Sequence, residues 1–164
     1  MFRVAGPSIL VALCAASLAG AQEVPNWVAR IRPDHPRLFF NTDTWPEVRA
    51  RAEGPLAEHF AAVKKTVGDR EGELPVGDWG CQAMNAAFVW RVTGDDHYLE
   101  RARYMLDRSL EFYHARIAEG KAVNWYSTTR ISALAAFDWI FDAVPEDWRV
   151  TWGRSMLDLS LIHI

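Results

Sequence analysis

The sequence predicts an all-α fold, and three observations support this prediction. Apolar residues recur at helical spacing in long segments, as at Tyr98, Ala102, Met105 and Leu106. No segment of similar length shows the strict alternation of apolar and polar residues that a half-buried strand requires. Half of the 164 residues are apolar and eight are Trp, which is ample for the core of one domain or part of one.

Residues 22–45 are predicted to form an extended N-terminal arm. Pro33 and Pro36 push the residues before them away from helical geometry, and the segment lacks helical periodicity. Within it, Leu38-Phe39-Phe40 is a short apolar run that we interpret as a strand-like anchor. We therefore expect the arm to press this run against the helices that follow.

The first helix is predicted to begin near Pro46 and to end at about Glu53. Asn41 to Thr44 offers several N-cap residues before it, and proline is favoured at the first helical position. Gly54-Pro55 interrupts the helix, after which an apolar helical face continues. Gly68 to Gly80 is rich in Gly, Pro and acidic residues, which predicts a loop.

Four further helices alternate between two kinds. Residues 81–92 and 127–141 are apolar around most of the helix, so these helices must be covered on most sides. Residues 98–117 and the segment from Pro145 each carry one apolar stripe opposite a charged face. This alternation predicts an incomplete (α/α) toroid of antiparallel helical hairpins over residues 46–158, with buried inner and amphipathic outer helices. A solenoid of helical hairpins would show the same alternation and stays an alternative.

Residues 1–21 are predicted to be a secretory signal peptide. Arg3 supplies a positive charge, an apolar stretch follows, and Ala19-Gly20-Ala21 has the small residues that signal peptidase accepts. A retained membrane anchor is the alternative, but the apolar run is short for a span of about 20 residues. A lipoprotein site at Cys14 is disfavoured by the bulky Leu13 before it. We expect a secreted or periplasmic protein without stable membrane insertion after cleavage.

The charge balance argues against general attraction to polyanions. The formal net charge is −3, from 18 basic and 21 acidic residues, and cleavage would remove only Arg3. Such a balance gives no general attraction to nucleic acid or anionic membranes, so we expect no nucleic-acid partner. The mature part keeps only Cys81, so it cannot form an intramolecular disulfide.

Three segments resemble, in order, those of heparinase II/III-like polysaccharide lyases of the alginate lyase-like superfamily. The first is Asp34–Val48, with its His-Pro-Arg-Leu motif and Thr-Trp-Pro-Glu-Val. The second is Ala86–Tyr98, in which a helix is followed by a Thr-Gly-Asp turn and a helix starting at Tyr. The third is Ile131–Asp142, with an Ala-Leu-aromatic-Asp-Trp pattern, followed by Pro145-Glu146-Asp147.

This resemblance implies a toroid that cleaves acidic, uronate-containing polysaccharides by β-elimination. The family's Asn-His pair, Tyr and second His lie beyond the segment that ends at Asp147, and no residue here matches the pair. We therefore assign no catalytic residue, metal or cofactor, and expect an N-terminal fragment that is inactive alone. The sequence decides neither the polysaccharide, nor the presence of a β-rich C-terminal region, nor the oligomeric state.

The best local candidates for substrate contact lie at the start of two buried helices. Trp125 or Tyr126 could stack on a sugar ring, and Arg130 could pair with a uronate carboxylate or sulfate. In the alternative interpretation the aromatic residues pack the helix start and Arg130 pairs with an acid. The full set of predicted substrate-binding residues is Asn124, Trp125, Tyr126 and Arg130, with Trp79 and Gln82 at the matching position of the preceding buried helix.

Asp138 and Asp142 lie four residues apart and could suggest a pair of acid–base carboxylates. Both lie among aromatic residues, and we interpret Asp138 as a buried, hydrogen-bonded residue. His35, between two prolines, is expected to pack or bond locally. An α/α-barrel glycoside hydrolase, which needs two carboxylates across a cleft, and a non-catalytic helical carbohydrate-binding or scaffold module stay alternative functions.

The last residues end without a helix stop signal. Leu159-Ser160-Leu161-Ile162-His163-Ile164 lacks a following Gly, Asn or Pro, and it resembles a translated sequencing-adapter read. We therefore expect 159–164 to be a non-native tail and assign His163 no role.

Overall fold

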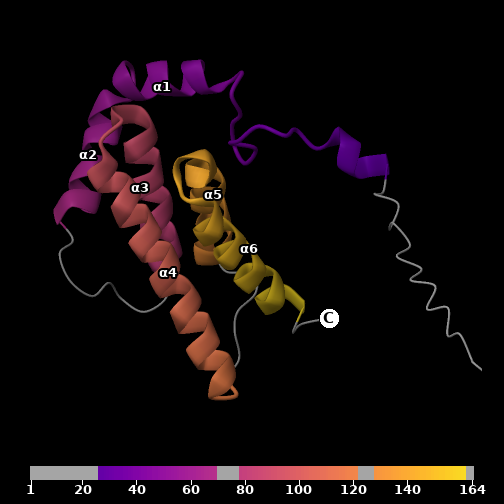
Figure 1. Cartoon of the computed structure of the whole chain (residues 1–164). Coiled ribbons are helices and arrows are strands. Elements are labelled where there is room, and N and C mark those ends of the chain that lie inside the picture. The colour runs from indigo at the N-terminus through magenta and orange to yellow at the C-terminus, as the bar shows by residue number, and fades with distance from the viewer. Residues whose placement is uncertain (1–25, 70–77, 122–127, 162–164) are drawn as a thin grey trace, which may run out of the picture. The chain divides into compact units, whose positions relative to one another are not determined.

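The computed structural model describes residues 26–69, 78–121 and 128–161. Every regular element among these residues is a helix and none is a strand, so the all-α prediction is confirmed. The chain divides after Ile31 into two units, and the described part of the first holds only the 3-10 helix η1. The elements are η1 (Asn26–Arg30), α1 (Trp45–Glu53), α2 (Ala57–Asp69), α3 (Trp79–Thr93), α4 (Asp96–Ala118), α5 (Thr128–Ile140), the 3-10 helix η2 (Phe141–Ala143) and α6 (Glu146–Leu161) (Figure 1).

Helices α3 and α5 form the centre of the second unit. The most extensive contacts join α3 to α5 and α3 to α4, while α4 also contacts α5 and α6. More than half of the residues of α3 and α5 are buried, whereas α4 and α6 each bury one stripe. The predicted toroid of antiparallel hairpins stays a prediction. Fully or nearly fully buried positions on the central pair are Ala83, Ala86, Ala87, Ala133, Ala135 and Ala136.

Small residues allow α3 and α5 to approach closely at their N-terminal ends. A Cβ atom placed on Gly80 would lie 1.9 Å from the Thr129 carbonyl oxygen, so only glycine fits there. One residue further, Cys81 Sγ lies 3.7 Å from both Thr129 Oγ1 and Ser132 Oγ. The sequence therefore places its smallest side chains where two backbones meet.

Local sequence signals explain where α4 and α1 begin. Gly94 ends α3 in the left-handed conformation, and its N–H donates to the Trp90 carbonyl oxygen over 2.7 Å. Asp95 then caps α4 by accepting the His97 N–H over 3.0 Å. Before α1 the N-cap residue Thr44 makes no side-chain cap bond to the helix. Asn41 Oδ1 accepts the backbone N–H groups of Asp43 and Thr44, and Thr44 Oγ1 accepts that of Asn41.

The segment Leu38-Phe39-Phe40 anchors the arm, but the prediction that it is strand-like is wrong. Phe40 is buried, with its ring 5.0 Å from Trp45 and 4.7 Å from Trp139. Phe39 has a positive φ of 68° in a bend of the chain, and its side chain is exposed. A bend replaces the strand because the backbone before it is hydrogen-bonded to one side chain of α5.

Within the described ranges, no helix combines the length and apolar character needed to cross a bilayer. The predicted signal peptide, residues 1–21, lies outside the described residues. Of the predicted tail, Leu159 is fully buried in α6. The assignment of 159–164 as non-native stays a prediction.

Candidate functional site

Four substrate-binding residues were predicted at the start of α5, and the structure describes one of them, Arg130. Arg130 has only 2 % of its surface exposed, and its guanidinium lies 4.7 Å from the centre of the Tyr113 ring on α4. Burial lowers the pKa of the Arg130 guanidinium, and Tyr113 opposes that shift. Asn124, Trp125 and Tyr126 lie outside the described residues. In this conformation Arg130 therefore offers no surface to a sugar.

Trp79 and Gln82, at the start of α3, are also buried. The Trp79 ring meets Phe112 edge-on at 5.5 Å, and the Arg108 guanidinium covers it at 5.5 Å. Gln82 Nε2 donates to Asp78 Oδ2 over 3.2 Å. The structure brings this helix start beside Thr129 of α5, as the Gly80 contact shows, but it uses the side chains for packing.

A buried polar cluster lies at the opposite end of α5, around Asp138. Its Oδ2 accepts the backbone N–H of Arg37 over 2.6 Å and that of Leu38 over 2.8 Å. Its Oδ1 lies 2.6 Å from His35 Nδ1, which is the donor toward a carboxylate. Asp138 is 6 % exposed, so the interpretation of a buried, hydrogen-bonded residue is confirmed.

Neighbouring residues of the arm, α3 and η2 add further contacts around Asp138. The His35 ring stacks on Phe141 at 3.9 Å, and Trp139 Nε1 donates to the Leu38 carbonyl oxygen over 2.9 Å. Arg91 of α3 donates from Nε to the Trp139 carbonyl oxygen over 2.8 Å. Burial lowers the pKa of Arg91, while the nearby Asp138 and Asp142 oppose that shift. The arm, α3 and α5 are therefore joined at one point.

The sequence did not reveal the pairing of His35 with Asp138. We expected His35 to bond locally, but its partner lies about a hundred residues away in the chain. Asp142 is exposed and does not join the cluster. Because the Asp138 carboxylate is fully engaged by the arm, it cannot serve as one of two cleft carboxylates in this conformation.

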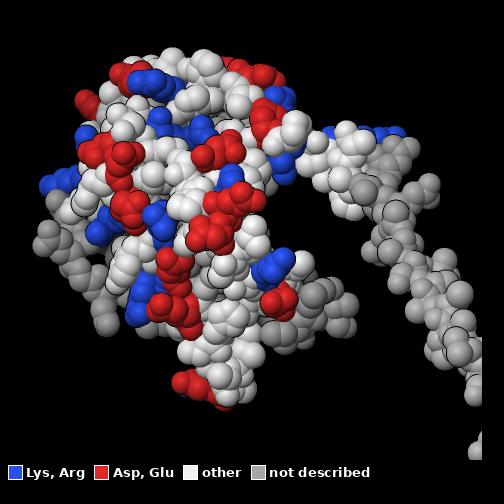
Figure 2. Space-filling model, viewed as in Figure 1, with Lys and Arg blue, Asp and Glu red and all other residues white. Residues whose placement is uncertain are grey.

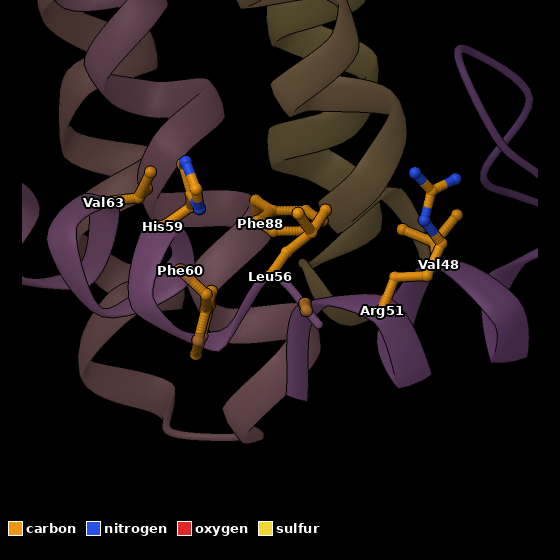
Figure 3. A pocket seen from close by; sticks show the side chains of 8 residues that line it. Val48, Arg51, Leu56, His59, Phe60, Val63 and Phe88 are labelled. Carbon is orange, nitrogen blue, oxygen red and sulfur yellow. The ribbon is translucent and has the colours of Figure 1, made fainter. Parts of the chain in front are cut away.

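An open apolar groove lies between α1, α2 and α3, with a cavity volume of about 240 Å³ (Figure 3). Arg51 and His59 are its polar side chains. The remaining lining residues are apolar: Val48, Ala52, Leu56, Phe60, Val63 and Phe88. A second groove of about 450 Å³ lies between α5 and α6. Aliphatic and aromatic side chains predominate in the first groove. The second adds Glu146, Arg149 and Arg154 to its apolar residues.

Charged side chains of both signs are interspersed on the face shown in Figure 2. On α4, Arg103 pairs with Glu100 over 3.1 Å and Arg108 pairs with Glu111 over 2.6 Å. Within the described ranges, no three His, Cys, Asp or Glu side chains come together as a metal site would require. Comparison with protein-family models, curated proteins and solved structures gives no match.

Proposed function

We propose that this chain forms the N-terminal part of an α/α-toroid domain of an exported lyase that cleaves acidic polysaccharides by β-elimination. The observation that carries this proposal is the Asp138 cluster. It joins His35, Arg37 and Leu38 to α5. Two of the three segments that resemble the heparinase II/III-like lyases thus form one hydrogen-bonded unit, as expected if both are parts of the same domain.

The packing of α5 supports a toroidal continuation. Thr129, Ser132 and Trp139 face α3. On the other side of α5, Ile131 is 54 % exposed and Leu134 is 41 % exposed. An inner helix of a closed ring has a neighbour on both sides, and this apolar side suits such a neighbour.

In this proposal the described residues stabilise the fold and take no part in the chemistry. β-Elimination needs a base for the proton next to the uronate carboxyl group, an acid for the leaving oxygen and groups that neutralise the carboxylate. The buried Asp138 and Arg130 instead hold helices and arm together. The lyase chemistry would come from the part of the parent enzyme that follows α6.

Two experiments test the proposed function. The reading frame of the source gene beyond the codon for Leu159 is expected to encode an Asn-His pair and a later Tyr. The product of that longer frame is expected to form unsaturated uronate from alginate or a glycosaminoglycan, followed by ultraviolet absorbance, while the 164-residue chain does not. Turnover by the 164-residue chain itself, or inactivity of the longer product on every acidic glycan, would contradict the proposal.

A non-catalytic helical scaffold is the second candidate function. The burial of Arg130, Trp79 and Gln82 favours it, because these predicted contacts are used for packing. Affinity electrophoresis in gels containing alginate, heparin or a neutral glucan separates the two candidates. Retardation of the longer product by an acidic glycan alone favours the lyase, whereas unchanged mobility in all gels favours the scaffold.

A further inference from the structure

The groove between α1, α2 and α3 is shaped by the turn that joins the first two helices. The Leu56 N–H donates to the Arg51 carbonyl oxygen over 2.8 Å, which closes this turn. Phe88 lines the groove from α3, and its ring meets Phe60 of α2 edge-on at 6.1 Å. Trp45 of α1 also meets Phe88 edge-on, at 6.2 Å. Aromatic contacts therefore fix the three helices around the groove.

The interior of this groove is apolar and has room for a slender ligand. Ala52 is buried on the α1 side, where its short side chain leaves the space unfilled. Ligand pockets combine such an apolar lining with a few polar groups that fix the orientation of the ligand. The volume of about 240 Å³ is below the usual range for drug-sized ligands, so a single hydrocarbon chain suits it better than fused rings.

Two polar side chains lie at the ends of this apolar lining. Figure 3 shows Arg51 and His59 at opposite ends, with Leu56 and Phe88 between them. Both polar residues are exposed, and neither side chain makes a hydrogen bond or ion pair with another described residue. The groove therefore offers nitrogen donors at its ends and hydrocarbon surface in its middle.

The two arginines of α1 differ in what they contact. Arg49 pairs with Glu53, four residues later, over 3.0 Å. Arg51 has Glu47 four residues before it, but these two described side chains form no such pair, and Arg51 lines the groove instead. A guanidinium binds a carboxylate through two parallel hydrogen bonds. Its position beside an apolar groove is therefore complementary to a molecule with a carboxylate at one end and a hydrocarbon chain behind it.

We propose that this groove binds a single-chain amphipathic carboxylate such as a fatty acid. The carboxylate pairs with Arg51, and the hydrocarbon chain runs past Leu56 and Phe88 toward His59. Arg51 holds the anion because a guanidinium keeps its charge in proteins, whereas a neutral imidazole carries none. The ligand is a free molecule and not a membrane surface, since the net charge of −3 gives no general attraction to anionic lipids. This site is independent of the proposed lyase function.

Calorimetric titration of the 164-residue chain with decanoate, below its micelle concentration, tests the proposal. Decanoate is expected to bind, and decyltrimethylammonium, which has the opposite head-group charge, is not. Octanoate should bind about tenfold more weakly than decanoate, since it buries two fewer methylene groups.

Charge variants on α1 locate the carboxylate. Arg51→Gln should raise the Kd for decanoate about fivefold, because the exposed ion pair is lost. Arg51→Glu should raise it further and allow decyltrimethylammonium to bind. Arg49→Gln makes the same change of charge two residues away, outside the groove, and is the matched control that should leave the Kd unchanged.

A filled groove gives a second, independent measurement. Ala52→Leu extends a side chain into the space and should abolish binding of decanoate, whereas Ala50→Leu, at an exposed position of the same helix, should not. Circular dichroism confirms that each variant is folded. If Ala52→Leu does not fold, the comparison of Arg51→Gln with Arg49→Gln still decides, because both arginines are exposed.

Several outcomes would overturn this proposal. They are the absence of decanoate binding, equal weakening by Arg51→Gln and Arg49→Gln, a larger effect of His59→Gln than of Arg51→Gln, and unchanged binding by folded Ala52→Leu. Co-sedimentation of the chain with phosphatidylglycerol vesicles would point to a membrane surface instead. Uronate formation by the longer product is measured separately, so failure of this site leaves the proposed function unaffected.

Discussion

The two ends of helix α5 hold buried charges in different ways. At the C-terminal end, Asp138 accepts two backbone N–H groups and faces His35, all from the N-terminal arm. At the N-terminal end, Arg130 lies over the Tyr113 ring, and Gly80 brings α3 against the Thr129 carbonyl group. One end is fixed by directional hydrogen bonds to a distant segment, and the other by close packing of neighbouring helices.

This difference shows that a charged residue in an apolar helix does not by itself mark a functional site. Asp138 and Arg130 are 6 % and 2 % exposed, and both stabilise contacts between elements. A buried carboxylate with three short contacts carries a larger energetic penalty when removed than a buried cation over an aromatic ring. The following predictions test that ranking.

Asp138→Ala is expected to have the largest effect. Removing the carboxylate leaves the backbone N–H groups of Arg37 and Leu38 and the His35 ring without their acceptor, which should lower the free energy of unfolding by about 3–5 kcal/mol. Urea denaturation measures this loss. Asp142→Ala, at an exposed position, is the control and should change stability by less than about 0.5 kcal/mol. Equal effects of the two variants would show that the cluster does not hold the arm.

Gly80→Ala tests the packed end of α5. The added Cβ would meet the Thr129 carbonyl oxygen at 1.9 Å, so α3 and α5 must separate, at an expected cost of about 1–3 kcal/mol. Gly68→Ala is the matched change in α2, where nothing lies within 4 Å of the added atom. It should stabilise the helix by about 0.5–1 kcal/mol. Thermal unfolding of both variants distinguishes crowding from helix propensity; stabilisation by both would refute the close contact.

A double-mutant cycle of Arg130→Met and Tyr113→Leu measures the cation–ring contact. The coupling free energy should be about 0.5–2 kcal/mol, since both side chains are shielded from water. Arg116→Met with Phe112→Leu is the comparison pair, with a longer distance of 5.7 Å and partial exposure. We expect a smaller coupling there. Zero coupling between Arg130 and Tyr113 would show that Arg130 is held by its other contacts alone.

Asp107, at intermediate burial on α4, is expected to show the smallest effect. Burial raises the pKa of its carboxyl group, while the hydrogen bond from Trp148 Nε1 opposes this shift. A raised pKa means that the folded state holds the proton more tightly, so the charged form destabilises the fold above that pKa. Asp107→Asn should therefore increase stability at neutral pH by less than about 1 kcal/mol.

The pH dependence gives the check on this last prediction. The gain from Asp107→Asn should disappear as the pH falls below about 3.9, the ordinary value for Asp, because the wild-type carboxyl group is then neutral in both states. Urea denaturation at several pH values measures it. Asp158→Asn, at an exposed position on α6, serves as control. A gain that is unchanged at low pH would rule out the burial of charge as its cause.

The sequence predicted the burial of several residues but not their distant partners. The stripe of Tyr98, Ala102 and Met105 is buried as its spacing required, and Asp138 is buried among aromatic residues as interpreted. The partner of Asp138 was missed because no local pattern relates His35 to a position about a hundred residues later. The exposure of Val150 and Leu157 on α6 was also missed, because the spacing of Trp148 and Trp152 pointed only to the buried face of that helix.

The sequence by itself determined the helical class, the alternation of buried and amphipathic helices and most helix ends, because these follow from periodicity and capping within a few residues. Only the tertiary structure decided that Arg130 lies inside, that Asp138 fastens the arm and that one side of α6 stays open. Burial and pairing of a charge depend on which remote segments cover it. That information is not carried by the spacing of neighbouring residues.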